Sequence, residues 1–449
     1  MLMSQTARAK PAPRGPSRPW SQARVIETPI ANRLTLASMF VFLAKIGNLP
    51  HLGHFEIGKV LVGLSMLALL FEGGGWKEGV FSHPVMRSYL GLFMMGILTI
   101  PIAVWPGGSA RFLFGNYLKD FVLIVLLIVT TRTPNDLRRM LWTIIINTLI
   151  LDLILLHYGD QKITIVHLGK NEIAMTSVIA FGMLLGLPVR GVGKALKLAA
   201  GLLLMYAIFM SVSRGSYLGL GAVMMMFMYF RFGRRAGLSI IVGVSLAGIL
   251  AVGAYSFGPP KVHHAINTLI HIQKDYNLTA RTGRIAIWKR GLRIVKANPL
   301  GVGMRNFPIA EGHIVEDVIG ERWMDAHNAL LEVTAELGIV GGIVFLTLLK
   351  RGMQTANRLR KRADSPEMAR IGLSAVLALF GYFVTASFLS EAYAVILYIQ
   401  MAVIISADRV YRYMAMREGD VLSGPRMREG GVLSGPRMRG DDVLSRSRT

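Results

Sequence analysis

The sequence predicts an all-α polytopic membrane protein with roughly twelve transmembrane helices and one large periplasmic loop. Three observations predict this class. Hydrophobic residues make up 53% of the 449 residues and charged residues only 17%, whereas soluble domains are about one quarter charged. The net charge is nevertheless +24, a combination that arises when apolar helices lie in lipid and basic residues lie in their loops. Apolar stretches long enough to cross a bilayer also recur along the chain.

A spanning helix needs about 20 mostly apolar residues. The stretches that meet this length are 33–50, 56–72, 88–105, 113–131, 139–157, 171–188, 195–213, 215–231, 237–257, 327–349, 370–388 and 391–408. The preceding residues, 1–32, are rich in Pro, Arg and Ser and lack the apolar run of a signal peptide. They predict a disordered basic cytoplasmic tail.

Basic residues in the short loops set the predicted orientation, because cytoplasmic loops collect Lys and Arg. With the N-terminus inside, the predicted cytoplasmic loops carry 18 Lys and Arg residues and the predicted outer loops carry 4. Both termini are therefore expected in the cytoplasm.

Two segments depart from this ladder of short loops. Residues 258–326 form one long outer loop between the spans 33–257 and 327–408, and its Trp and Ile content predicts a folded catalytic domain. Residues 409–449 contain an eleven-residue repeat, MREGDVLSGPR, then MREGGVLSGPR, then MRGDDVLSRSR. Gly and Pro interrupt any helix in the first two copies, so this segment predicts a low-complexity cytoplasmic tail.

Composition also excludes several functions. The absence of Cys excludes thiol catalysis, disulfides, Cys-based zinc sites and iron–sulfur clusters. No basic stretch is interleaved with aromatic residues on a soluble fold, so no nucleic-acid partner is expected. A twelve-helix transporter remains an alternative, although transporters usually place their polar sites at the membrane midplane rather than in one outer loop.

The first motif is SRGSYLGL at 213–220, in a tight outer turn between two apolar helices. An arginine near a helix end commonly extends to the lipid interface. Arg214, however, lies on the side where short loops avoid cations. The next residue, Gly215, leaves room for a ligand to approach the backbone.

The second motif is RTGRIAIWKRGLRIVKANPLGVG at 281–303. On a helical wheel, one face is basic and is expected to be solvated or to touch lipid headgroups; it carries Lys289, Arg290, Arg293 and Lys296. The apolar side carries Ile285, Trp288, Leu292 and Val295, and Ile287 and Ile294 lie at its edge. Arg284 and Arg281 also belong to the apolar side. A cation there, at a helix N-terminus, is costly unless it meets an anion.

The third motif is DAHNALLEVTAELGIVGGIVFL at 325–346, where the loop returns to the membrane. A lone interfacial histidine is more often structural than catalytic. Glu332 and Glu336 share a helix face, and neither is a natural orienting partner for His327. Two arginines and one histidine on the same side of the membrane nevertheless suit transfer from a pyrophosphate leaving group to a hydroxyl.

With these motifs in this order, the sequence resembles the O-antigen ligase and polymerase family of membrane oligosaccharide transferases. The matching features are SRGSYLGL, then R-I-A-I-W followed by NPLGVG, then H-N with L-L-E-V-T-A-E-L-G-I-V-G. The resemblance covers roughly residues 33–410. It implies a GT-C-like glycosyltransferase in the bacterial inner membrane, with an active site that faces the periplasm and serves lipopolysaccharide or polysaccharide biosynthesis.

The resemblance also implies the chemistry. A glycan on undecaprenyl pyrophosphate would pass to an acceptor hydroxyl without a metal ion or other cofactor. Arg214 and Arg284, with Arg281, would bind the pyrophosphate, and His327 would activate the acceptor. Asp325 and Asn328 beside it are candidate acceptor-binding residues.

Several readings remain open at this stage. The acceptor could be lipid A core, a growing polymer or a protein, because ligases, repeat-unit polymerases and protein O-oligosaccharyltransferases share these motifs. Ala329 stands where relatives often carry an aromatic residue, which leaves the acceptor undecided. A metal-dependent glycosyltransferase is a further alternative, since Asp317, Glu321 and Asp325 are spaced to share a helix face.

Overall fold

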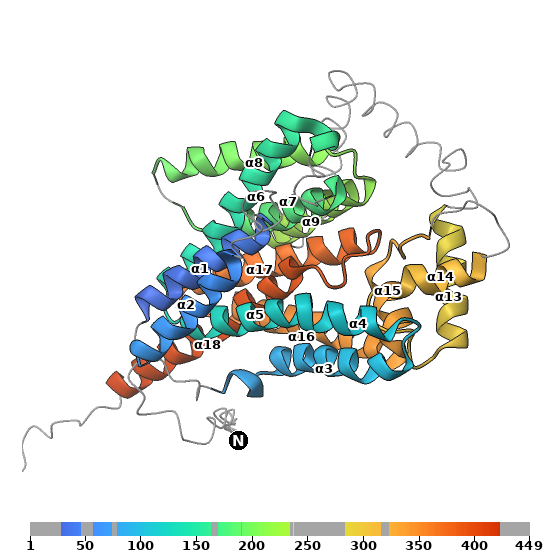
Figure 1. The fold of residues 1–449 in the computed structure, drawn as a ribbon. Helices are drawn as coiled ribbons and strands as arrows, with labels where there is room; N and C mark the ends of the chain where they lie inside the picture. The colour runs from blue at the N-terminus through green and yellow to red at the C-terminus, as the bar shows by residue number, and fades with distance from the viewer. Residues whose placement is uncertain are drawn as a thin grey trace, which may run out of the picture. The chain divides into compact units, whose positions relative to one another are not determined.

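The structure is a computed structural model and describes residues 28–45, 57–73, 79–162, 169–189, 191–233, 237, 283–315 and 323–422. Every regular element among these residues is a helix (Figure 1). The helices of the first part of the chain are α1 (Pro29–Leu43), α2 (Ile57–Phe71), α3 (Pro84–Thr99), α4 (Pro106–Phe112), α5 (Leu118–Thr130), α6 (Pro134–Lys162), α7 (Lys170–Gly186), α8 (Gly193–Met210) and α9 (Arg214–Phe232). Those of the second part are α13 (Arg284–Ala297), α14 (Phe307–Val315), α15 (Ala329–Glu336), α16 (Gly338–Arg362), α17 (Pro366–Ala386) and α18 (Val395–Leu422).

Proline marks the start of many of these helices. α1, α3, α4, α6 and α17 each begin at a proline, where the missing N–H is harmless and the fixed φ already suits a helix. Short irregular turns, 3-10 at Val80–Ser82 and Ile100–Ile102 and a π turn at Leu113–Tyr117, join or continue the helices around α3, α4 and α5.

Five stretches are long and apolar enough to cross a membrane among the described residues: Pro84–Ile102, Pro106–Thr130, Pro134–His157, Gly193–Met210 and Pro366–Ala386. α1 and α2 are apolar but shorter. These helices lie where spans were predicted, and the chain has the character of a membrane protein. The full set of roughly twelve spans stays a prediction, and the proposed span 237–257 lies outside the described residues apart from residue 237.

The predicted span 327–349 is divided in two. α15 ends at Glu336 and α16 begins at Gly338, whose φ of +75° is left-handed and is readily adopted by glycine. The prediction of a single helix through this segment was therefore wrong. α18 also continues to Leu422, past residue 408 where the last span was predicted to end.

α17 packs against α7, α9 and α16 at the centre of the bundle (Figure 1). Gly182 and Gly186, four residues apart on α7, allow the two backbones to approach closely. A Cβ at Gly182 would lie 2.8 Å from the backbone N of Ala378, and one at Gly186 would collide with Ser374. This contact fixes the middle of α17, whose C-terminal end borders the candidate site.

The two ends of the helix bundle differ in the contacts that they make. At one end the amides of Ile30 and Ala31 bond to the Glu72 carboxylate, and His83 pairs with Asp408 at 3.3 Å. This end joins loops that were predicted to be cytoplasmic. The other end carries the three motifs and is described below. The tail, residues 412–449, forms a separate unit, and most of its repeats lie outside the described residues.

Candidate active site

α13, α14 and α15 enclose a small apolar core at the motif-bearing end (Figure 1). The buried members of this outer core are Ile287, Ile294, Val302, Phe307, Ala310, Ala326 and Ala335. They come from both sides of residue 327, so the second and third motifs fold together. This packing gives the functional side chains a fixed scaffold.

The buried face of α13 covers only one edge of the apolar side that the helical wheel predicted, the edge that carries Ile287 and Ile294. Ile287, Gly291 and Ile294 are buried, whereas Leu292 is 62% exposed. Gly291 allows α13 to pack closely on α15, since a Cβ at this position would lie 2.7 Å from the Leu331 side chain. The wheel ranks residues by their own polarity, but the partner helices α14 and α15 decide which face is covered.

Arg290 was expected on a solvated basic face, and this expectation was wrong. Its Nε bonds to Oε1 of Glu311 on α14 at 2.7 Å, and the two side chains are only 12% and 2% exposed. Glu311 also accepts the backbone N–H of Met324 at 3.1 Å. Arg290 therefore joins α13, α14 and the segment that leads to His327. Lys289, Arg293 and Lys296 are exposed, as expected for a basic face.

The NPLGVG turn after α13 is bound to the break between α15 and α16. The N–H groups of Val302 and Gly303 donate to the carbonyls of Ala335 and Glu336 at 3.0 and 2.9 Å. Gly301 has φ +100°, and a Cβ there would collide with the Glu336 backbone. The glycines in this motif therefore serve a close approach of two backbones, which ties the end of α13 to α15.

Arg214 and Arg284 each begin a helix, α9 and α13 respectively. A helix N-terminus presents free N–H groups and favours negative charge, so each guanidinium lies beside a second anion-attracting feature. The turn before Arg214 is held at Val212 with φ +58°. Such a conformation costs roughly 1–3 kcal/mol in a β-branched residue and often occurs at functional sites.

The α9 turn contacts the segment 387–394, which joins α17 to α18. A Cβ at Gly215 would lie 3.0 Å from Cβ of Phe388, so the glycine next to Arg214 packs directly on this segment. The backbone N–H of His327 donates to Oγ of Ser390 in the same segment at 2.7 Å. The first and third motifs thus border one short stretch of chain.

His327 is half-buried and precedes α15, outside the candidate membrane spans. Its φ of +47° is left-handed. Burial lowers the pKa of its imidazole below the ordinary 6.5, and the positive charge of Arg284 lowers it further, while Asp325 opposes the shift. Arg284 and His327 are therefore close enough to interact electrostatically. The lowered pKa favours the neutral imidazole, the form that a base requires.

The other predicted residues are placed as follows. Asn328 caps α15, because its Oδ1 accepts the N–H of Leu331 at 3.0 Å. Asp325 is exposed beside His327. Arg281 lies outside the described residues, as do Asp317 and Glu321 of the metal alternative. Within the described ranges, no group of three or more His, Asp or Glu side chains could hold a metal ion.

Arg305 is a further cation at this end that the sequence analysis did not select. Its Nη1 lies 3.5 Å from Oε1 of Glu332, and its guanidinium lies over the Phe112 ring. Glu336 accepts the N–H groups of Arg305 and Phe307 at 2.8 and 3.0 Å. The two α15 carboxylates thus fix the 305–307 turn rather than the imidazole. A charged residue two positions after NPLGVG was the signal available in the sequence.

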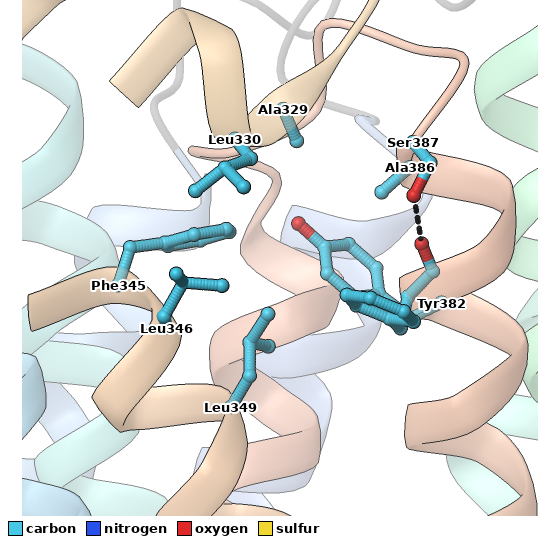
Figure 2. A pocket seen from close by; sticks show the side chains of 9 residues that line it. Ala329, Leu330, Phe345, Leu346, Leu349, Tyr382, Ala386 and Ser387 are labelled. Carbon is cyan, nitrogen blue, oxygen red and sulfur yellow. Dashed lines mark hydrogen bonds between the residues drawn. The ribbon is translucent and has the colours of Figure 1, made fainter. Parts of the chain in front are cut away.

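A small apolar groove, with a cavity of about 20 Å³, lies between the start of α15 and the helices α16 and α17 (Figure 2). Its walls are Ala329, Leu330, Phe345, Leu346, Leu349, Tyr382, Phe383, Ala386 and Ser387. Figure 2 shows Leu330, Phe345 and Leu346 facing the Tyr382 ring across the groove. Leu346 and Phe383 are 42% and 47% exposed, so the groove opens on a surface that suits lipid.

Residues 199–346 match the family model described as O-antigen ligase. This segment is O-antigen ligase-like. It contains all three motifs, and the family resemblance predicted from them is confirmed. A comparison with curated proteins found no match. The apolar helices indicate a membrane protein. The O-antigen ligase-like segment indicates a glycosyltransferase-like enzyme that acts in glycan transfer for polysaccharide biosynthesis.

Proposed function

We propose that the chain transfers a glycan from undecaprenyl pyrophosphate to an acceptor hydroxyl, and that lipid A core is the acceptor. The observation that carries the proposal is that the O-antigen ligase-like segment combines the Arg284 guanidinium with the half-buried His327 imidazole, whose pKa burial and this cation lower. One group suits an anionic leaving group and the other suits a hydroxyl that must lose its proton.

The leaving group is the pyrophosphate. Cleavage of the bond between the anomeric carbon and the phosphate oxygen leaves negative charge on that oxygen. Arg214 and Arg284 would stabilise this charge, each by a planar fork that can bind two oxygens and each at the first residue of a helix. Arg281 would extend the same cationic surface.

The acceptor proton passes to His327. As the hydroxyl oxygen forms the new bond to the anomeric carbon, its proton transfers to the neutral imidazole. Burial and the cation of Arg284 lower the pKa of this imidazole and so favour its neutral form. Asp325 and Asn328 flank this position and would contact the acceptor. No metal is needed for either half of this transfer.

The exposed apolar side chains around the groove support a lipid-linked donor, which would lie along this surface and not inside the small cavity. Ala329 and Leu330 at one wall of the groove directly follow Asn328, and Ser387 at its other wall adjoins Phe388. A polyprenyl chain lying along α16 and α17 would bring its pyrophosphate to the end of the bundle that carries His327. Burial of each chain CH₂ contributes about 0.8 kcal/mol.

The proposed active site faces the periplasm of the bacterial inner membrane. The distribution of Lys and Arg supports this orientation, with 18 in the loops predicted inside and 4 in those predicted outside. An activated lipid-linked donor would supply the driving force there, where nucleotide sugars are not expected.

The test combines the purified full-length chain, an undecaprenyl-pyrophosphate-linked glycan and lipopolysaccharide that carries only lipid A and core. We expect the core to gain the glycan in one step, without added metal. Extension of the donor glycan without core modification would instead identify a polymerase, and glycosylation of an added protein an O-oligosaccharyltransferase. If no acceptor is modified while the substrate is fully turned over by a known ligase, the proposed reaction is wrong.

A further inference from the structure

The conformation of His327 is held by contacts at three consecutive residues. Trp288 donates its Nε1–H to the carbonyl of Ala326 at 3.1 Å. His327 donates its own N–H to Ser390, and Asn328 caps α15. A left-handed residue in a turn changes the direction of its side chain if φ relaxes, so these contacts determine where the imidazole points.

Ser390 belongs to a stiff segment. The hydroxyl of Tyr382 on α17 donates to the carbonyl of Glu391, and the hydroxyl of Tyr398 on α18 donates to the carbonyl of Ala392, both at 2.9 Å. The N–H of Ala392 bonds to Glu332 on α15 at 3.2 Å. α15, α17 and α18 therefore all fix the neighbours of Ser390.

We propose that Ser390 is a positioning residue for glycan transfer, because its hydroxyl accepts the His327 N–H and holds the imidazole toward the reacting hydroxyl. This inference rests on the proposed function, in which His327 is the base. Ser390 lies outside residues 199–346 and acts through the backbone of His327 rather than by contact with substrate. A shift of about 1 Å in a catalytic group can cost about 10²-fold in rate.

The first experiment compares Ser390→Ala with Ser390→Thr in the transfer assay. Ser390→Ala should lower kcat about 10–100-fold and leave the KM for the donor within about twofold. The substitution removes the Ser390 Oγ that accepts the His327 N–H, but the contacts to the pyrophosphate remain. Ser390→Thr keeps the oxygen and should recover most of the rate. Trp288→Phe removes the neighbouring N–H and should lower kcat in the same direction.

A matched control is Ser374→Ala. Ser374 is buried on α17, and its Oγ donates to the Met183 carbonyl at 2.9 Å, away from the segment 387–394. This control should keep the wild-type kcat. Thermal unfolding and detergent-phase size exclusion check that each variant is folded.

The decisive readout is a double-mutant cycle with His327→Ala. If Ser390 acts through the imidazole, Ser390→Ala should have no further effect once the imidazole is gone. An equal loss of kcat in both backgrounds would show a general structural role and overturn the inference. Unchanged kcat in folded Ser390→Ala, beside an inactive His327→Ala, would also overturn it while leaving the proposed function intact. A fully active His327→Ala would instead refute the proposed base.

Discussion

Arg290→Gln tests whether the buried ion pair between α13 and α14 holds the outer core together. The Arg290 and Glu311 side chains are 12% and 2% exposed, so the substitution leaves a carboxylate buried without its cation. Removing one partner of a buried pair costs about 3–5 kcal/mol. Because about 1.4 kcal/mol corresponds to tenfold in an equilibrium constant, local opening should increase at least about 10²-fold.

Native-state proteolysis with thermolysin measures this opening, since Ile287 is 0% exposed and the bond between Ala286 and Ile287 becomes a cleavage site only when the outer core opens. Arg293→Gln is the matched control, because Arg293 is exposed on the same helix. The Arg293→Gln protein should be cleaved within about threefold of the wild-type rate. Adding Glu311→Gln to Arg290→Gln removes the uncompensated charge and should recover part of the protection. Equal cleavage of the Arg290→Gln and Arg293→Gln proteins would refute the reasoning.

Three further predictions follow from the site. Arg284→Lys and Arg214→Lys should each lower transfer about 10–100-fold, because an ammonium cannot bind two phosphate oxygens as a guanidinium does; wild-type rates in both would contradict the pyrophosphate assignment. Transfer should fall as the pH drops through the His327 pKa, which lies below 6.5; Arg284→Gln removes a cation and should move this acid limb to higher pH, whereas Arg284→Lys should leave it in place. Alkaline phosphatase fused after His313 should be active and the same enzyme fused after Arg360 inactive, because the phosphatase works in the periplasm; the reverse pattern would refute the orientation.

The helices and the grouping of the motifs could be predicted from the sequence. Apolar length and starting prolines predict elements such as α3 and α17, and basic loops predict which turns share an end. The order of SRGSYLGL, NPLGVG and H-N was specific enough to indicate the family that the matched segment 199–346 confirms.

Other features depend on partners that a linear pattern does not reveal. Arg290 reads as one more cation on a basic face, and only the position of Glu311 on α14 makes it a buried ion pair. Ser390 is an ordinary serine in a loop until the fold brings it to the N–H of His327. The break at Gly338 had a visible signal, since the segment ELGIVGG is rich in glycine, but its apolar residues continue the helical pattern.

His327→Ala in the transfer assay tests the central claim most directly. His313→Ala is the matched control, because His313 is an exposed histidine on α14, one of the helices that enclose the same outer core. The account predicts that His327→Ala lowers kcat about 10²–10⁴-fold, the usual contribution of one acid–base group, with donor binding retained, and that His313→Ala transfers at the wild-type rate. Full transfer by a folded, membrane-inserted His327→Ala protein would contradict it.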